Sequence, residues 1–553
     1  MEEILFDKPN FDDEEKYLLE PFFTNLDKSV YAILFLPPEV VGALCSRASR
    51  AKEDLRVVFL KEFVKPFLES DYGQAFKNFV DFLHQNSYEV LFANPKAREF
   101  YIKWLAEYGD DSIAQMAGTH LVYSSLSQIA IKHIENQRIG IAPIEKSTRY
   151  VDYSLKINNH YLYFTPPEIE KIGLKEEYEE VMNNLFETYT LFYQKYLDFL
   201  KNRYPEEKEI VLKTKAFDVV RLILPLSTLG QLALFGNGQA FEYLINRSLN
   251  HHLEEIKWLG KRAKEELDKI IPAFLRRIEK EESKEYRKYL GERSERIKEC
   301  LANLNNTRIN EDKDISVNLR NQYTRSSAVK LIEYDKDGED KIIAGLLYQE
   351  IKEPWEKIFE KVKRLSVFEK EKILEKVLKD RKYRWYKVPR AFENVYLRFE
   401  ILVNIGAWRD LQRHRMQTQI HQKFNIDNGF DIPEELEEIG LKEKFVSAIE
   451  NLEKLYQKIE DKDLAQYAVS FAHHVRFLQY QNLRQFFWET ELRTTPQGHP
   501  HYRKIEQEKA KIIQEIYPLI SKYLLVDFQD YEFARRESVK KIEEKLKKLS
   551  ENE

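Results

Sequence analysis

Three consecutive basic residues, Arg413, His414 and Arg415, form the sharpest local motif of the sequence. Four residues separate them from an apolar segment, residues 394–408, and basic groups beside such a segment are costly unless water or anions oppose their charge. The planar guanidinium of arginine matches phosphate oxygens and the polar edges of a flavin. A bound anionic cofactor would therefore explain the motif. An exposed basic turn with water and carboxylate partners is the alternative.

A second group of polar residues lies in a short segment of the first half and consists of Glu145, Ser147, Arg149 and Tyr150. Ser147 and Arg149 are two residues apart, and side chains at that spacing project to one side of an extended strand. A hydroxyl and a guanidinium placed in this way can hold a phosphate from one direction. Ordinary pairing on the surface of a strand is the alternative.

Two more segments that contain arginine are candidates for anion binding. Arg221 lies in the apolar stretch AFDVVRLILPL, where a buried guanidinium needs an anion from a ligand or from a structural salt bridge. Asn482 and Arg493 are eleven residues apart, about three helical turns, which places both on nearly one face of a predicted helix. Arg484 points elsewhere, so this helix can contact two ligand groups. A polar helix surface is the alternative.

Paired histidines do not predict a metal site in this sequence. The pairs are His251 and His252, His473 and His474, and His499 and His501. Adjacent helical residues diverge by about 100° and cannot readily chelate one ion, and no convincing third ligand stands at metal spacing. The sequence also lacks a G-x-G-x-x-G turn, a P-loop and a nucleophile elbow.

Long helices account for much of the expected structure around these motifs. Residues 30–36 are rich in strand-favouring residues and predict a strand, and the segment after Pro38 predicts a helix. Apolar residues near a helical period predict amphipathic helices over residues 181–200 and 446–459. The charged stretch 280–314 predicts a solvated helix that leads into a linker.

An internal repeat of domain size is the most informative large-scale feature. Asn237 and Asn482 occupy similar motifs and are 245 residues apart, much further than the period of any solenoid repeat. Duplication of a whole domain is the natural interpretation. A tight hairpin predicted over residues 328–348, with its turn at Asp337-Gly338, would open the second domain.

The composition excludes several classes of protein. The chain has 553 residues, 43% of them hydrophobic, with only 17 glycines and 18 prolines, which suits two or three helix-rich globular domains. Its 88 basic and 93 acidic residues nearly balance, so nothing favours nucleic-acid or membrane binding. Only Cys45 and Cys300 are present, which excludes a disulfide framework. An acidic start without signal-peptide features, and no apolar run long enough to span a bilayer, predict a cytoplasmic protein.

Taken together, these motifs resemble those of the flavin-dependent thymidylate synthases, or thymidylate synthase complementing proteins. The resemblance covers most of the chain, once per half. The second half looks like the flavin-binding part of the family pattern and keeps Glu393, Arg413, His414, Arg415, Asn482 and Arg484. The first half looks like the nucleotide-binding part and keeps Glu145, Ser147, Arg149, Tyr150 and Arg221. By the same resemblance Arg493 is the catalytic candidate, a cation near the uracil ring of the substrate.

Each half departs from the family pattern where the other half keeps it. At the position of the Arg-His-Arg motif the first half reads Glu135-Asn136-Gln137-Arg138. Where the first half keeps its nucleotide residues, the second half has His421, Lys423, Asn425 and Gln466. The resemblance therefore implies composite sites. Each of them needs one flavin-binding surface, from the second half, and one nucleotide-binding surface, from the first half.

The resemblance implies two tandem α+β domains, residues 1–310 and 320–553, each a small antiparallel sheet packed with long helices. It implies a methyltransferase that converts dUMP to dTMP, with FAD as cofactor and NADPH and methylenetetrahydrofolate as cosubstrates. Family members are homotetramers with sites between chains, so we expect a homodimer that mimics a tetramer. The alternatives are flavin-dependent modification of another pyrimidine nucleotide and a noncatalytic flavin- or nucleotide-binding protein.

Overall fold

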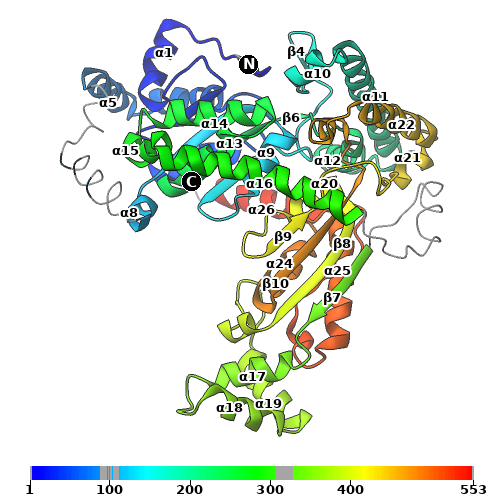
Figure 1. Cartoon of the computed structure of the whole chain (residues 1–553). Coiled ribbons are helices and arrows are strands. Elements are labelled where there is room, and N and C mark those ends of the chain that lie inside the picture. The colour runs from blue at the N-terminus through cyan, green and yellow to red at the C-terminus, as the bar shows by residue number, and fades with distance from the viewer. Residues whose placement is uncertain are drawn as a thin grey trace. The chain divides into compact units, whose positions relative to one another are not determined.

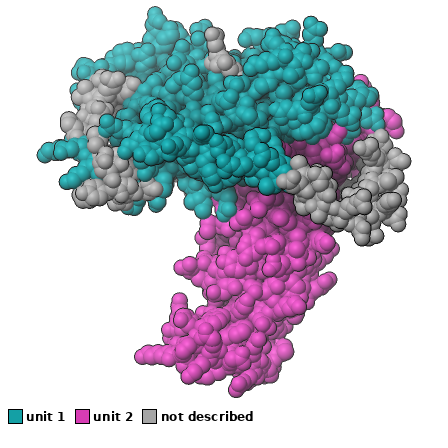
Figure 2. All heavy atoms as spheres, in the orientation of Figure 1, with its two compact units in different colours: residues 1–190, 224–321, 450–468 teal, residues 191–223, 322–449, 469–553 magenta. Residues whose placement is uncertain are grey.

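The computed structural model describes residues 3–86, 111–305 and 328–550, together with residues 96, 99 and 103. The chain divides into two compact units, shown in teal and magenta in Figure 2. The first unit comprises residues 1–190, 224–321 and 450–468, and the second comprises residues 191–223, 322–449 and 469–553. Each unit therefore includes a segment from the other half of the sequence. The linker expected near residues 310–320 lies outside the described residues.

Within the described ranges, each unit contains a four-stranded antiparallel sheet, and the two sheets have the same topology. The four strands of the second sheet can be followed in Figure 1. The strands of the first sheet are, in spatial order, β1 (Val30–Ile33), β2 (Gly118–Ser127), β6 (Leu229–Asn237) and β3 (Ile141–Glu145). Those of the second sheet are β7 (Ala328–Tyr334), β8 (Tyr396–Asn404), β10 (His474–Asn482) and β9 (Thr418–His421). The order repeats strand for strand, which confirms the predicted duplication and the α+β class.

Helices make up most of the remaining structure. Those of the first half are α1 (Asp13–Leu19), α2 (Pro38–Arg47), α3 (Leu55–Phe59), α4 (Lys65–Leu68), α5 (Gly73–Gln85), α8 (Asp111–Met116), α9 (Gln128–Glu135), α10 (Pro167–Lys171), α11 (Lys175–Arg203), α12 (Glu209–Val220), α13 (Gly238–Leu249), α14 (Glu254–Leu267), α15 (Pro272–Leu275) and α16 (Glu281–Asn305). Those of the second half are α17 (Gly338–Leu347), α18 (Trp355–Lys363), α19 (Val367–Leu378), α20 (Ile405–Leu411), α21 (Glu434–Glu438), α22 (Lys442–Lys458), α23 (Lys462–Ala465), α24 (Leu483–Arg493), α25 (Pro500–Ile516) and α26 (Arg536–Ser550). Short elements used below are the 3-10 turns η4 (Arg221–Ile223) and η6 (Arg390–Asn394).

Several elements predicted from the sequence are confirmed. Strand β1 lies within the predicted strand and is followed by α2, and α16 covers most of the predicted charged helix. The two predicted amphipathic helices correspond to α11 and α22, which bury apolar residues such as Leu185, Phe192, Ile449 and Leu452. Across the part of the chain that the structure describes, no helix combines the length and apolar character needed to cross a membrane.

Strand pairing determines which residues of the two copies correspond. Glu145, the last residue of β3, pairs with Leu232 of β6. His421, the last residue of β9, pairs with Phe477 of β10. Leu232 and Phe477 are separated by the same 245 residues as the two repeat asparagines. His421 therefore occupies the position of Glu145, in agreement with the alignment of the sequence motifs.

Both repeat asparagines cap a helix at the end of a central strand. Asn237 Oδ1 accepts from the backbone amide of Ala240 at 2.8 Å, and Asn482 Oδ1 accepts from that of Gln485 at 2.9 Å. Asparagine is favoured at this position because its side chain satisfies a backbone donor that the helix leaves unpaired. The two residues therefore determine where α13 and α24 begin.

In the second unit, the two-residue period of β8 separates the core from the surface. Leu397, Phe399 and Ile401 are buried, and the intervening residues are more exposed. Helices α24 and α25 cover the apolar face of the sheet (Figure 1). Phe399 packs against Phe486 of α24 with ring centroids 6.3 Å apart. This packing places α24, which carries several predicted site residues, directly on the sheet.

The hairpin predicted over residues 328–348 is wrong. Strand β7 ends at Tyr334 and pairs with β8, and the residues after Asp337 form α17. Gly338 is needed for close packing and not for a turn, because a Cβ there would lie 2.6 Å from the ring of Tyr517. Sequence pattern alone did not distinguish the two roles, since both require glycine.

We expect Gly338→Ala to destabilise the protein by about 1–3 kcal/mol, the usual effect of overpacking. The added methyl must displace Tyr517, whose hydroxyl donates to the carbonyl of Asp335 at 2.6 Å. Urea and thermal unfolding measure the change. Gly42→Ala is the matched control, because this exposed glycine lies within α2 and its Cβ would meet no atom within 4 Å. The free energy of unfolding of the Gly42→Ala variant should rise by about 0.5–1 kcal/mol. Equal changes in the free energy of unfolding of the two variants would contradict the packing role of Gly338.

Candidate functional site

A pocket of about 430 Å³ in the second unit brings together three of the residues predicted to bind flavin. Glu393 comes from η6, whereas Asn482 and Arg484 come from the start of α24. The turn η6 packs against α24, so residues far apart in the sequence line one cavity. The lining also includes Arg381, Arg384, Lys387, Arg390, Met416 and Trp488. The cavity is therefore rich in positive charge.

Arg484 and Glu393 form an ion pair in the wall of this pocket. Arg484 Nη1 donates to Glu393 Oε1 at 2.7 Å, and Arg484 Nε donates to the carbonyl of Val388 at 2.9 Å. Arg390 also pairs with Glu393, at 3.1 Å. Hydrogen bonds from Arg390 and then from Arg484 lower the pKa of Glu393. The carboxylate therefore holds both arginines at the wall of the pocket.

Two other cations of the pocket, Arg384 and Lys387, make no hydrogen bond or ion pair with any described residue. They lie over the indole of Trp488, at 5.4 and 5.8 Å from the ring centroid. Arg381, in contrast, is committed to Glu491 through hydrogen bonds of 2.6 and 2.5 Å. Arg384 and Lys387 can therefore bind an anionic ligand beside an aromatic ring.

Arg384, Lys387 and Trp488 were not predicted from the sequence. A sequence signal was present for the first two, because basic and aromatic residues are interspersed in KYRWYK, residues 382–387. Such a mixture of basic and aromatic residues is typical of surfaces that bind phosphates and stack on rings. Nothing in the sequence indicated that Trp488 of α24 would lie beside this segment.

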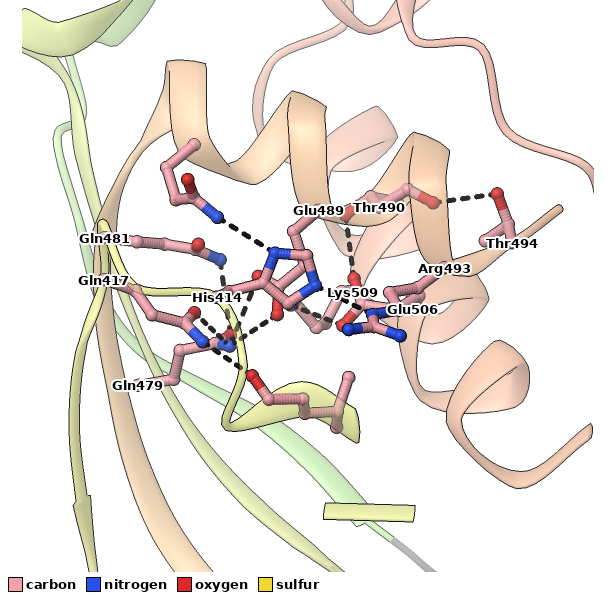
Figure 3. Close-up of polar contacts among 12 residues, drawn as sticks. His414, Gln417, Gln479, Gln481, Glu489, Thr490, Arg493, Thr494, Glu506 and Lys509 are labelled. Carbon is pink, nitrogen blue, oxygen red and sulfur yellow. Dashed lines mark hydrogen bonds and ion pairs between the residues drawn. The ribbon is translucent and has the colours of Figure 1, made fainter. Parts of the chain in front are cut away.

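The Arg-His-Arg motif lies in residues 411–417, here called the motif turn, which begins at the last residue of α20. Arg413 and Arg415 are exposed, whereas His414 is 6% exposed. Arg493 Nε donates to His414 Nε2 at 2.8 Å, and the amide of Gln485 lies 3.3 Å from His414 Nδ1. Both partners belong to α24, so this helix anchors the middle residue of the motif (Figure 3).

His414 is neutral in the folded protein. Burial, followed by the positive charges of Arg493 and Lys509, holds its pKa well below the ordinary value for histidine. Because a guanidinium cannot accept a hydrogen bond, His414 Nε2 is the unprotonated ring nitrogen. Arg493 is also held by Asp410, whose backbone carbonyl accepts from Arg493 Nη2 at 2.5 Å. The motif turn thus fixes the predicted catalytic Arg493, whose side chain remains 15% exposed.

The predicted nucleotide residues of the first unit lie at the end of β3. Glu145 is buried, and its carboxylate accepts from Lys132 Nζ at 3.0 Å. The prediction that Ser147 and Arg149 project from one side of a strand is wrong, because β3 ends at Glu145 and residues 147–151 form a turn. The hydroxyl of Ser147 accepts from the backbone amide of Arg149 at 3.2 Å. Serine favours such a turn because its side chain satisfies a nearby backbone donor.

Two neighbours add positive charge to this turn. The guanidinium of Arg50 lies 5.1 Å from the ring centroid of Tyr150. Burial lowers the pKa of Lys146 to about 8, and its ammonium donates to the carbonyl of Lys52 at 3.2 Å. Lys146 was not predicted, although it lies between Glu145 and the rest of the motif. A lysine with a lowered pKa beside predicted phosphate ligands is a candidate site residue.

Arg221 belongs to the second unit, whereas the other four predicted nucleotide residues belong to the first. It is 2% exposed, which confirms the burial expected from its apolar surroundings. Its Nη2 donates to the carbonyl of Gly406 at 3.1 Å. Arg221 therefore contacts the first turn of α20, the helix that leads into the motif turn.

One histidine lies beside two carboxylates. His252, Asp461 and Asp463 each place a potential ligand atom within 4.8 Å of the others. His252 Nε2 is 3.2 Å from Asp463 Oδ2, and Lys298 Nζ is 3.9 Å from the same oxygen. The spacing of histidines did not reveal this group, because the aspartates are distant in the sequence. We assign no metal to it, since the ammonium of Lys298 already opposes the carboxylate.

Both copies match one protein family, described as thymidylate synthase complementing protein, over residues 72–273 and 330–519. The chain belongs to this family. UPF0159 proteins of Chlamydia muridarum, Chlamydia pneumoniae and Thermoplasma acidophilum are 32%, 31% and 30% identical to it. The matches cover 95%, 94% and 89% of this chain and 97%, 96% and 96% of the relatives. The likeness therefore spans both copies of the thymidylate synthase complementing protein fold.

Among solved structures, the UMP/dUMP methylase PolB from Streptomyces cacaoi matches about a third of the chain. The structure bound with 5-Br dUMP is 14% identical, with a TM-score of 0.30, over 36% of this chain and 95% of that chain. The structure bound with 5-Br UMP is 13% identical, with a TM-score of 0.28, over 37% of this chain and 97% of that chain.

We expect His414→Gln to flatten the dependence of stability on pH. In the wild type, the contribution of neutral His414 to the free energy of unfolding is fully present above about pH 6.5. It is lost as the pH falls toward the depressed pKa of His414 in the folded state. Below about pH 6.5 the unfolded chain binds a proton at His414 and the folded chain does not. His414 therefore adds at most about 1.4 kcal/mol per pH unit to the slope of the free energy of unfolding against pH. Urea unfolding at about pH 5, 6 and 7.5 measures it. Identical slopes for variant and wild type would show that His414 titrates normally.

Proposed function

We propose that this protein is a flavin-dependent enzyme that methylates dUMP to dTMP, with methylenetetrahydrofolate as one-carbon donor and NADPH as reductant. Its family supports the reaction class. The observation that carries the proposal is the basic pocket of the second unit, where Glu393, Asn482 and Arg484 meet available cations. Met416, the residue after the Arg-His-Arg motif, lines the same pocket.

The pocket fits the chemistry of FAD, which combines a diphosphate with two aromatic ring systems. Arg384, Lys387 and Arg484 would hold phosphate oxygens, and the indole of Trp488 would contact a ring. The full set assigned to the cofactor is Glu393, Arg413, His414, Arg415, Asn482 and Arg484, with Arg384, Lys387 and Trp488 added from the structure. Bound FAD supplies the redox chemistry, and the protein supplies binding and orientation.

Arg493 is the residue that we assign to the reacting ring of the substrate. His414 and Asp410 fix its guanidinium from two sides. A cation beside the uracil ring stabilises the negative charge that develops as C5 becomes nucleophilic. Because His414 is neutral, it orients Arg493 without adding a second charge at the same place. Preorganised charge of this kind needs no rearrangement when the reaction occurs.

The nucleotide is assigned to the turn that follows β3. Ser147 and Arg149 would bind its phosphate, and Glu145, Tyr150 and Arg221 complete the substrate set. Only the first copy keeps the residues corresponding to Glu145, Ser147, Arg149 and Tyr150, and only the second copy keeps the Arg-His-Arg motif. Each site would therefore combine the nucleotide-binding residues of a first copy with the flavin-binding residues of a second copy. We extend the proposal to a cytoplasmic homodimer that mimics the tetramer expected for unduplicated family members.

The reaction itself can be followed at C5 of the substrate. With FAD, NADPH and methylenetetrahydrofolate, the purified protein should release tritium from dUMP labelled at C5 and should form dTMP, because methylation replaces that hydrogen. Turnover of another pyrimidine nucleotide instead of dUMP would indicate a related modification enzyme. Binding of flavin and nucleotide without proton release would indicate a noncatalytic protein and would contradict the proposal.

Flavin binding should depend on the second copy alone. Arg415→Ala should weaken FAD binding about ten- to a hundredfold, as expected for the loss of a charge-assisted hydrogen bond worth about 1.5–3 kcal/mol. Arg138→Ala, in the nearest counterpart of the motif, is the matched control and should leave flavin bound. Flavin absorbance after gel filtration, together with a titration, measures both. Equal losses in the two variants would disprove the division between the copies.

A further inference from the structure

A buried chain of hydrogen bonds lies beneath the motif turn (Figure 3). The amide of Gln417 donates to the carbonyl of Leu411 at 3.0 Å, which ties the two ends of the turn together. The amide of Gln479, on β10, donates to Gln417 Oε1 at 2.6 Å and to Glu489 Oε1 at 3.1 Å. The motif turn, the central strand and α24 are therefore joined through these three side chains.

The network ends in charged groups that have no contact with solvent. Lys509, on α25, donates to Glu506 at 2.8 Å and to Glu489 at 3.2 Å. The side chains of Lys509, Glu489 and Glu506 are all 0% exposed. Burial of such a cluster is expensive, and replacement by well-packed apolar residues is often stabilising. Stability of the fold alone does not account for it.

The first copy shows what the fold itself requires at these positions. By the pairing of the strands and the position of the capping asparagines, the counterparts of Gln417, Gln479 and Glu489 are Ile141, Leu234 and Leu244. All three are buried, with exposures of 2%, 1% and 0%. The same architecture is thus built from apolar residues in the copy that lacks the Arg-His-Arg motif.

Helix α24 shows the same contrast along one face. Gln485, Glu489 and Arg493 are spaced four residues apart and therefore share a side of the helix. Two of them contact His414, and the third receives the hydrogen bond from Gln479. The corresponding residues of α13 are Ala240, Leu244 and Ser248. The polar face accompanies the motif and is not needed to pack the helix.

We infer that Gln417, Gln479 and Glu489 are positioning residues, which hold the motif turn in the arrangement that presents its two exposed arginines to an anionic ligand. Hydrogen bonds are strong and directional in a buried, low-dielectric site. A turn that is already ordered loses less conformational entropy when the ligand binds. The identity of the ligand as flavin rests on the proposed function, whereas the ordering of the turn does not.

Gln417→Ile and Gln479→Leu, singly and together, test the inference, because the first copy already carries the same residues at these positions. In the flavin-free protein, amide hydrogen exchange within residues 411–417 should become about tenfold faster, and the Kd for flavin should rise about tenfold. The Kd for dUMP should not change. Gln231→Leu is the matched control, since Gln231 is 1% exposed on β6 of the first sheet, and it should leave both the turn and flavin binding unaltered.

The two measurements separate this inference from the proposed function. Faster exchange in the motif turn with unchanged flavin affinity would support the positioning role and would count against the turn as a flavin site. A lower Tm with unchanged exchange in the turn would overturn the inference, because that result describes a merely structural role. Unchanged exchange and unchanged flavin affinity in a folded variant would overturn it as well. The single substitutions provide the same comparison if the double variant does not fold.

Discussion

The antiparallel pairing of β8 with β10 is the constraint on which the site of the second copy depends. Nine residue pairs align the end of β8 with the start of β10, so α20 and α24 leave the sheet at opposite ends. Helix α24 has eleven residues and runs back about 16 Å along the sheet, which returns Arg493 to the motif turn after α20. A shift of one residue in this pairing would turn every buried side chain to the opposite face and separate Arg493 from His414.

Duplication allows one fold to be built with two different interiors. In the first copy, apolar residues such as Leu234 and Leu244 fill the space between the central strand and its helix. In the second copy, Gln479 and Glu489 occupy the same positions and must satisfy one another because water does not reach them. The interior of the second copy therefore buries less apolar surface at these positions, and its hydrogen bonds hold the motif turn in a defined conformation.

The second unit also separates groups that orient from groups that remain available to bind. His414 is buried and neutral, and it holds Arg493 through a nitrogen lone pair. Arg384 and Lys387 lie at the pocket over an indole and make no ion pair among the described residues. The positive charges available to an anionic ligand, those of Arg384 and Lys387, are therefore at the pocket. The buried His414 instead fixes the position of Arg493.

The sequence by itself determined features that depend on neighbours within a few residues. The amphipathic helices α11 and α22 and the burial of Arg221 follow from the apolar period and the apolar surroundings, and the repeat follows from the spacing of two asparagines. Only the tertiary structure decided that Gly338 packs against Tyr517, because helix and hairpin patterns both accept glycine. It also decided that Trp488 lies beside the KYRWYK segment and that Gln417 meets Gln479. These contacts join residues far apart in the chain, and strand pairing, which no local pattern specifies, brings them together.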